Sequence, residues 1–370
     1  MVRIRALAAA LAFCTAVASA SQGQAQAPFY KGKQLTLLVN FGAGSATDID
    51  ARVFARHFIK HIDGAPQLIV QNMAGGGGAN GTMFLGEVAP KDGTVVGFLT
   101  ATAWNFAAEP ERFRVDFKTY EHVGYTGGTA VYYMRKDVPP GIAKPTDIVK
   151  AKGLVSGGVN ARTGRDISIR LTLDILGVPF RHVTGYGSGE RARLALQRQE
   201  IHLYADTTPG YRGAVEGTLV KDGTVIPLWY DPHYDGKTFG RSKQVEGLPI
   251  RAYHEVYQEI FGKMPSGQLW DTYLALITLN GAMQRILSLP PGAPPAAVAA
   301  LRAALQRLNN DKEFHADATK VLGFIPEYYA GADVGPQIRN ALTVKPEIRK
   351  FVAEYIPKGA AGAKGGKGAK

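Results

Sequence analysis

Two glycine-rich turns are the clearest places where backbone amides could hold a small anion. The first, residues 41–48 (Phe-Gly-Ala-Gly-Ser-Ala-Thr-Asp), follows the apolar run 35–39 and precedes a helical pattern. The second, residues 71–81, contains four consecutive glycines and also follows an apolar, β-rich run. Glycine lacks the Cβ that would block close approach of the backbone, and a helix N-terminus adds free N–H groups and a positive dipole end. The two loops together favour a captured solute over a bound cofactor.

The first turn could instead belong to a dinucleotide-binding fingerprint or be a purely structural tight turn. Gly42 and Gly44 match the first two glycines of the pattern G-x-G-x-x-G, but Thr47 stands where the third glycine should be. Nicotinamide binding is therefore the weaker interpretation, and the structural turn stays open as an alternative.

Further donor groups gather in a segment between a predicted strand and a predicted helix. Asn160 and Thr163 can donate hydrogen bonds to a carboxylate, and Arg162 or Arg165 could clamp one bidentately. The alternative for Arg165 is a surface ion pair with the aspartate that follows it. The loop 184–188 (Thr-Gly-Tyr-Gly-Ser) likewise places donors before a helix.

Asp206 ends another predicted strand. An acid at that place could bind a ligand amine or hold a loop, and the structural role is the favoured one.

Catalytic and metal chemistry find little support. His57 and His61 stand four apart on a helix, a spacing that can bind metal, but no third ligand is near in the sequence, so a packing role is favoured. Ser45 does not sit in a G-x-S-x-G nucleophile pattern. We therefore predict a binding protein that is not an enzyme, with no catalytic residue, no metal and no cofactor.

The N-terminus reads as a signal peptide, residues 1–27. A basic start is followed by a short apolar stretch and by two A-x-A patterns, which end at 20 and 27. Cys14 is the only cysteine and follows a bulky phenylalanine, which disfavours lipidation, and the cleaved chain would contain no disulfide. The sequence therefore predicts an exported, soluble, periplasmic protein.

The net charge of +12 is unevenly placed. Two arginines lie in the leader and four lysines in a Gly/Ala/Lys tail, so half of the excess lies outside the body of the chain. We predict that the tail, residues 353–370, is disordered, with weak membrane-surface contact as a minor alternative. The body has no basic stripe of the kind that binds nucleic acid.

Short apolar runs alternate with helical patterns, which indicates βαβ units and mainly parallel sheets. Ligands of such folds bind beyond the carboxyl ends of the strands. The predicted strands are 35–39, 67–71, 94–99, 121–125, 131–135, 153–156, 201–206 and 224–230. The predicted helices are 47–62, 78–89, 145–151, 166–176, 188–199, 294–309 and 311–322.

Over residues 29–330 the chain resembles the substrate-binding receptors of tripartite tricarboxylate transporters, the Bug family. The resemblance rests on several pieces in a fixed order, none of them diagnostic alone. They are Phe29–Phe41, Gly44-x-x-Thr47-Asp48, Ala51-Arg52, Val70–Asn72 with its glycine run, Pro90–Thr94, Leu176–Val183 with Gly185-Tyr-Gly, Pro291–Pro294 and Leu322-Gly-Phe324.

The resemblance implies a two-lobed α/β periplasmic-binding-protein (Venus flytrap) fold that closes around a small carboxylate. The first lobe's ligand-facing residues would be Phe41, Gly42, Ala43, Gly44, Asp48, Ala74, Gly75, Gly76, Gly77, Gly78, Thr100 to Thr102 and Asn105. The second lobe's would be Asn160, Ala161, Thr163, Tyr186 and Asp206. The chain departs from the family at Asn40, where proline is usual, at Ser45-Ala46, and in a longer 160–166 segment that adds Arg162 and Arg165.

The resulting interpretation is a monomeric receptor that delivers a dicarboxylate or aromatic acid to membrane transporter subunits. The expected lobes are 28–124 with 240–352, and 125–239, joined by crossing strands near 120–135 and 224–232. The two added arginines motivate the hypothesis of a second negative group on the ligand. The alternative is a sensor that presents its closed form to a membrane kinase.

Overall fold

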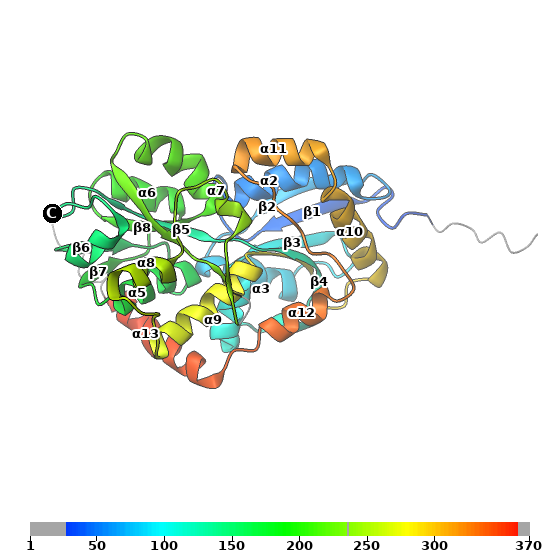
Figure 1. The fold of residues 1–370 in the computed structure, drawn as a ribbon. Helices are drawn as coiled ribbons and strands as arrows, with labels where there is room; N and C mark the ends of the chain where they lie inside the picture. Colours follow the sequence, from blue (N-terminus) through cyan, green and yellow to red (C-terminus); the bar gives the residue numbers. More distant parts are fainter. Residues whose placement is uncertain (1–26, 235–236, 362–370) are drawn as a thin grey trace, which may run out of the picture.

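A computed structural model of the chain describes residues 27–234 and 237–361, so residues 1–26 of the predicted signal peptide lie outside the described part. The strands form two five-stranded sheets, and Figure 1 shows one lobe around each sheet. The first sheet has the order β2-β1-β3-β12-β4, and the second has the order β7-β6-β8-β5-β9. The two-lobed α/β fold is therefore confirmed.

The strand bounds agree closely with the predicted ranges where a strand was predicted. In the first sheet they are β1 Gln34–Val39, β2 Gln67–Asn72, β3 Val95–Thr100, β4 Glu121–Thr126 and β12 Arg285–Leu289. In the second they are β5 Ala130–Arg135, β6 Leu154–Gly157, β7 Phe180–Val183, β8 Leu203–Thr207 and β9 Val225–Tyr230. A small hairpin adds β10 His233–Tyr234 and β11 Phe239–Gly240.

Both sheets are mixed rather than mainly parallel, which corrects the prediction. In the first sheet β1 pairs in parallel with β2 and β3, whereas β12 pairs antiparallel with β3 and β4. In the second, β6 pairs in parallel with β7 and β8, whereas β5 pairs antiparallel with β8 and β9. β5 and β12 each follow a crossing from the other lobe, so each enters its sheet against the direction of the βαβ strands.

Helices flank both sheets (Figure 1). Near the first sheet lie α2 Ala46–Phe58, α3 Ala79–Glu87, α4 Thr102–Ala108, α10 Pro295–Leu308, α11 Lys312–Leu322 and α12 Val334–Ala341. Near the second lie α5 Gly164–Ile175, α6 Gly189–Gln197, α7 Thr208–Tyr211, the π-helical Arg212–Val220, α8 Tyr253–Phe261, α9 Gln268–Ala282 and α13 Pro346–Ala361. Short 3₁₀ turns occupy Ile59–His61, Gly76–Gly78, Pro110–Arg112, Phe117–Thr119, Pro145–Lys150 and Lys243–Val245. Among the described residues, no helix is both long and apolar enough to span a bilayer.

Helix α2 shows how the sequence builds an element that borders both lobes. Its N-cap Ser45 accepts a hydrogen bond from the N–H of Asp48 at 3.3 Å, which satisfies one of the free amides of the first turn. Phe54 and Phe58 stack with 4.5 Å between ring centroids and are fully buried in the core of the first lobe. Full burial of each such side chain contributes about 1.5–3 kcal/mol. The predicted amphipathic helix 47–62 is confirmed.

The chain passes between the lobes at residues 127–129 and again between α9 and β12. The N–H of Gly128 donates to the carbonyl of Gly281 at 2.8 Å and so joins the two crossings. A Cβ on Gly128 would collide with the side-chain amide of Gln284, so a larger residue there would displace that side chain. The second crossing is not near residues 224–232, because the chain stays beside the second sheet through α8 and α9.

Helices α8 and α9 differ from the predicted division, which placed residues 240–352 in the first lobe. Tyr253 of α8 packs edge-on against Trp229 of the second sheet, 5.2 Å between ring centroids, and its hydroxyl donates to the carbonyl of Thr172 at 2.8 Å. Helix α9 packs against α5 and α4. Because of these contacts, residues 253–282 lie beside the second lobe. The rest of the predicted division into lobes stays a prediction.

The C-terminal segment corrects the prediction of a disordered tail from residue 353. Helix α13 continues to residue 361, because Tyr355 and Ile356 are buried and the guanidinium of Arg170 donates to the carbonyl of Tyr355 at 2.6 Å. The same guanidinium lies 4.1 Å over the Tyr355 ring. Residues 362–370 lie outside the described part.

Asn40 ties the carboxyl ends of β1 and β3 together. Its Nδ2 donates to the carbonyls of Gly78 and Thr100 at 3.0 and 2.9 Å, and its Oδ1 accepts from the N–H of Thr100 at 2.9 Å. The side chain is fully buried, so Asn40→Ala leaves buried backbone groups without partners. We expect the free energy of unfolding in urea to fall by about 1–3 kcal/mol.

The matched control is Asn310→Ala, since this exposed asparagine lies in the turn after α10 and its side chain donates to the carbonyl of Gln306 at 3.2 Å. It should change stability by less than about 0.5 kcal/mol. Equal stability of the Asn40→Ala variant and the parent protein would refute the bracing role.

Candidate functional site

A cavity of about 100 Å³ lies between the lobes, at the carboxyl ends of β1, β3 and β8. It has room for several water-sized groups, since one needs roughly 10–15 Å³ on this measure. This is the position where open α/β sheets bind ligands. Its lining consists of Phe41, 45–47, 100–101, 128–130, Val159, 163–165, Ser168, 188–190, 206–207, Asp231, Ile277, 280–281 and Gln284.

Apart from the four-residue α7, whose N-cap Thr207 also lines the cavity, four of the described helices begin there, two from each lobe. Their N-cap residues, Ser45 for α2, Ala101 for α4, Thr163 for α5 and Ser188 for α6, all belong to the lining. Each helix N-terminus carries free N–H groups and the positive end of the helix dipole. Four such ends around one small cavity favour an anionic group inside it.

Arg165 adds a full positive charge to the same cavity. It lies in the first turn of α5, and its Nη1 donates to the hydroxyl of Tyr204 at 3.3 Å. Within residues 27–234 and 237–361 its guanidinium forms no ion pair, so the alternative of a surface pair with Asp166 is not realised. Asp166 is instead fully buried and accepts hydrogen bonds from the N–H of Val159 and the hydroxyl of Thr163, each at 2.9 Å. Arg165 therefore remains available to a ligand.

Asp206 lines the cavity, but its carboxylate is already engaged. Arg193 donates to its two oxygens at 2.9 and 3.0 Å, and the hydroxyl of Tyr133 donates at 2.8 Å. The arrangement agrees with the structural role favoured for this residue. Arg193 also donates to Glu190, another acid of the lining, at 3.3 Å, so one guanidinium faces both carboxylates.

Asp231 is a cavity residue that the sequence reading missed. Tyr273 donates to its Oδ1 at 2.8 Å and Tyr132 to its Oδ2 at 3.2 Å. Burial raises the pKa of Asp231 to about 7, although these two hydrogen bonds and the charge of Arg165 lower it. Near neutral pH this group is therefore partly protonated, and it can donate as well as accept a hydrogen bond.

The structure brings Phe41, Thr100, Ala101, Thr163, Arg165 and Asp206 together at the cavity. Asp48 instead holds the first turn inside its own lobe, where it accepts from the N–H of Gly44 and the amide of Asn72, both at 2.8 Å. The other predicted residues outside the lining are Gly42, Ala43, Gly44, Ala74, Gly75, Gly76, Gly77, Gly78, Thr102, Asn105, Asn160, Ala161, Arg162 and Tyr186. Their contact with a ligand stays a prediction.

The second glycine loop lies where the lobes touch. A Cβ on Gly77 would stand 3.0 Å from the methyl of Thr163, so glycine allows the two lobes to approach here. Asn105 donates to the carbonyl of Gly77 at 2.9 Å and supports the loop from below. Arg162, on the facing loop, forms an ion pair with Glu109 of the first lobe. These contacts connect the lobes beside the cavity.

Several other lining residues were not singled out individually from the sequence. Ser45 and Ser188 lie in two of the predicted donor loops and are helix N-caps, which the capping preference of serine could have revealed. Asn280 and Gln284 come from the end of α9 and the crossing after it. No local pattern marks these two, because their position depends on how the lobes meet.

Several solved structures share this architecture. The periplasmic binding protein BugD is 18% identical, with 90% of this chain and 99% of that chain covered and a TM-score of 0.62. The chain has the fold of periplasmic binding proteins. MatC from Rhodopseudomonas palustris, solved with malate, is 17% identical over 90% of this chain and 99% of its own, with a TM-score of 0.58. A second R. palustris protein, solved with adipate, is 16% identical over 89% and 98%, with a TM-score of 0.60.

No protein-family model and no curated protein matches the sequence of this chain. The fold implied by the Bug-family resemblance is confirmed. BugD is named as a periplasmic binding protein, and two further structures with this fold are named as a TctC solute binding protein and a periplasmic transporter. The fold does not identify the ligand of this chain, so we infer the class of ligand from the side chains that line the cavity.

The raised pKa of Asp231 predicts a pH-dependent stability. Its folded-state pKa of about 7 exceeds the ordinary value of 3.8, so the folded protein binds more protons over this interval and loses stability as pH rises through it. We expect the free energy of unfolding in urea to fall less between about pH 5 and about pH 8 in Asp231→Asn than in the parent protein.

Asp222→Asn is the control, because this exposed aspartate has a lowered pKa and stays ionised throughout that interval. It should keep the parent's pH dependence. If Asp231→Asn also keeps it, Asp231 is an ordinary ionised carboxylate.

Proposed function

We propose that this protein is an extracytoplasmic receptor that captures a small carboxylate, a dicarboxylate or aromatic acid, between its lobes and delivers it to a membrane transporter. One observation carries the proposal: two helix N-termini from each lobe and the Arg165 guanidinium surround a single small cavity. Carboxylates are the common small anions that such N–H groups and a guanidinium bind well. The proposed function assigns no catalytic residues.

The ligands of two structural neighbours support this class of solute. MatC was solved with malate and another R. palustris protein with adipate, and both ligands are diacids. In this chain a first carboxylate would face the helix N-termini, and a second would face Arg165. Asp231 would contact a hydroxyl or protonated oxygen of the ligand rather than a bare carboxylate.

Capture would work through closure of the lobes. A ligand that contacts both lobes binds the closed form more tightly than the open form, and this difference shifts the population toward closure. The closed form would then be further stabilised by the ion pair Arg162–Glu109 and by the contact of Gly77 with Thr163. The predicted signal peptide, outside the described residues, places this capture in the periplasm.

The alternative is a sensor whose closed form is presented to a membrane kinase. Both roles use the same closed lobes, so the ligand cavity does not separate them. Deletion of the gene separates them: loss of uptake of the bound acid supports transport, whereas intact uptake with a lost transcriptional response supports sensing.

A thermal-shift screen of ligand-free protein tests the proposal. The panel contains malate, adipate, monocarboxylates, tricarboxylates and aromatic acids, with neutral sugars as controls. A ligand at a hundredfold excess over its Kd stabilises the folded state by about 2.7 kcal/mol, so one acid class should raise the melting temperature. If no carboxylate in the panel raises the melting temperature, the proposed function is refuted, whereas the assignment of the fold is unaffected.

The two added arginines should behave differently in calorimetric titrations with adipate and hexanoate. Arg165→Ala removes charge-assisted hydrogen bonds in the cavity, worth about 1.5–3 kcal/mol, and should weaken adipate binding by about tenfold or more. The same substitution should weaken the binding of hexanoate, which has a single carboxylate, by a smaller factor. Equal losses for the two ligands would exclude a second negative group as the partner of Arg165.

Arg162→Ala is the matched comparison, since its exposed ion pair with Glu109 acts on closure rather than on the ligand. A surface pair contributes up to about 1 kcal/mol, so it should weaken both acids alike, by less than about fivefold. A loss specific to adipate would instead place Arg162 on the ligand, as the sequence predicts.

A further inference from the structure

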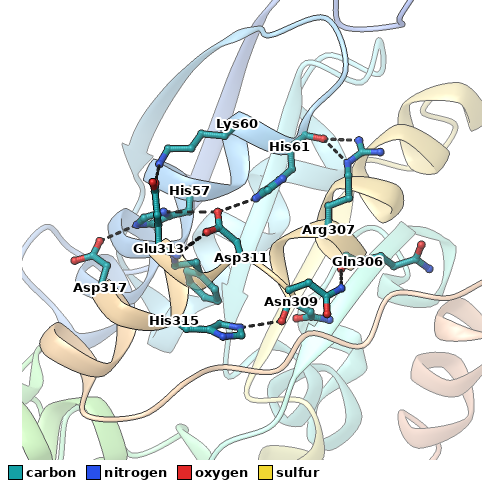
Figure 2. A network of polar contacts seen from close by, with 12 residues as sticks. His57, Lys60, His61, Gln306, Arg307, Asn309, Asp311, Glu313, His315 and Asp317 are labelled. Atoms are coloured by element: carbon teal, nitrogen blue, oxygen red, sulfur yellow. Dashed lines mark hydrogen bonds and ion pairs between the residues drawn. The ribbon is translucent and has the colours of Figure 1, made fainter.

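A second cluster of polar side chains joins α2 to α11 on the first lobe, away from the cavity. Figure 2 shows His57 near the end of α2 and His61 in the 3₁₀ turn after it, facing Asp311, the N-cap of α11, and Glu313 and Asp317 of α11. One ligand atom from each of His57, Asp311 and Glu313 lies within 4.8 Å of the other two. The sequence offered no third ligand for the two histidines, because these acids lie about 250 residues further along the chain.

The His57 ring has an unsatisfied nitrogen that points into this cluster. Its Nε2 lies 3.0 Å from Asp317 Oδ2, and since a carboxylate only accepts, the neutral tautomer that fits this contact has its proton on Nε2. Its Nδ1 then presents a lone pair, is buried, and has no hydrogen-bond partner in the described residues. The nearest acidic oxygen, Asp311 Oδ2, stands 3.9 Å away. Two electron-rich atoms at this separation leave a place suited to a cation.

The surrounding contacts hold these donors in position. Asp311 Oδ1 caps α11 by accepting from the N–H groups of Glu313 and Phe314 at 2.8 and 3.1 Å, and His61 Nε2 lies 2.8 Å from Asp311 Oδ2. A carboxylate on the far nitrogen of a histidine, as Asp317 is here, is the usual outer partner of a metal-binding imidazole.

We propose that His57 Nδ1, the Asp311 carboxylate and the Glu313 carboxylate bind one divalent transition-metal ion, with zinc as the best-matched example. One imidazole and two carboxylates are donors that zinc accepts at about 2.0–2.2 Å, and water would take the fourth position. Closing the cluster around the ion requires small movements, mainly of Glu313, whose side chain is 76% exposed. The site is separate from the proposed ligand cavity, since His57 lies about 16 Å along α2 from its first residue at roughly 1.5 Å per residue.

Two cations in the structure compete with a metal ion for these acids. Lys60 Nζ lies 2.7 Å from Glu313 Oε2, and Arg56 Nη1 lies 2.6 Å from Asp317 Oδ2. Lys60 and Glu313 are both largely exposed, so their pair is weak and is readily exchanged for a metal–carboxylate bond. Arg56 pairs only with the outer acid and does not occupy the proposed ligand atoms. Lys60 is therefore the residue that opposes metal binding.

Calorimetric titration of untagged, EDTA-treated and dialysed protein with zinc sulfate tests the site. The parent protein should bind one zinc ion per chain, and His57→Gln or Glu313→Gln should weaken binding by at least about tenfold, since even an outer partner's loss costs that much. Lys60→Ala should strengthen binding, an effect that a purely structural ion-pair network would not produce. His315→Gln is the control, because this histidine lies on α11 outside the cluster and contacts the carbonyl of Asn309.

The proposal fails if the parent protein binds no zinc saturably, or if both Glu313→Gln and His57→Gln bind as the parent does. His57 is buried, so its variant is first checked for a parental circular dichroism spectrum. Should it fail to fold, the exposed Glu313→Gln variant decides alone: unchanged affinity overturns the site, and a tenfold loss supports it.

Discussion

The close joining of the two chain crossings is the constraint on which the cavity depends. Gly128 donates its N–H to the carbonyl of Gly281, and the Gln284 amide fills the space that a side chain would need. This joint sets the carboxyl ends of both sheets face to face. As a result, helices whose caps are far apart in the sequence begin at a single cavity, and their dipoles add there instead of dispersing over the surface.

The balance of charge inside the cavity determines which class of ligand the cavity favours. The carboxylate of Asp206 is paired with Arg193, and burial raises the pKa of Asp231 to about 7. Glu190, a further acid of the lining, also accepts from Arg193, at 3.3 Å. Arg165 is the one positively charged side chain among the described residues of the lining. A cavity with one guanidinium, several helix N-termini and a proton-sharing acid is complementary to an organic acid that also carries a polar oxygen. The same reasoning explains why the chain needs no bound metal in this cavity to attract an anion.

The sequence predicts local features well and long-range ones poorly. The apolar runs that became β1 to β3, β6 and β8 and the capped helices α2, α5 and α6 follow from period and turn chemistry. Helix α9 was missed because Gln268–Ala282 is apolar on nearly all sides and shows no helical stripe. Of the site, Phe41, Thr163 and Arg165 follow from strand ends and caps. Asp231 does not, because its role depends on tyrosines brought to it by folding.

The central claim is that the cavity recognises the negative charge of a small organic acid. Calorimetric titration of ligand-free protein with a diacid that gives a thermal shift, and with its dimethyl ester, tests this claim most directly. The ester keeps the shape of the ligand and loses its charge. We predict saturable binding of one diacid per chain and at least about a hundredfold weaker binding of the ester, as expected when two charge-assisted contacts are lost. Equal affinity for acid and ester would contradict the account.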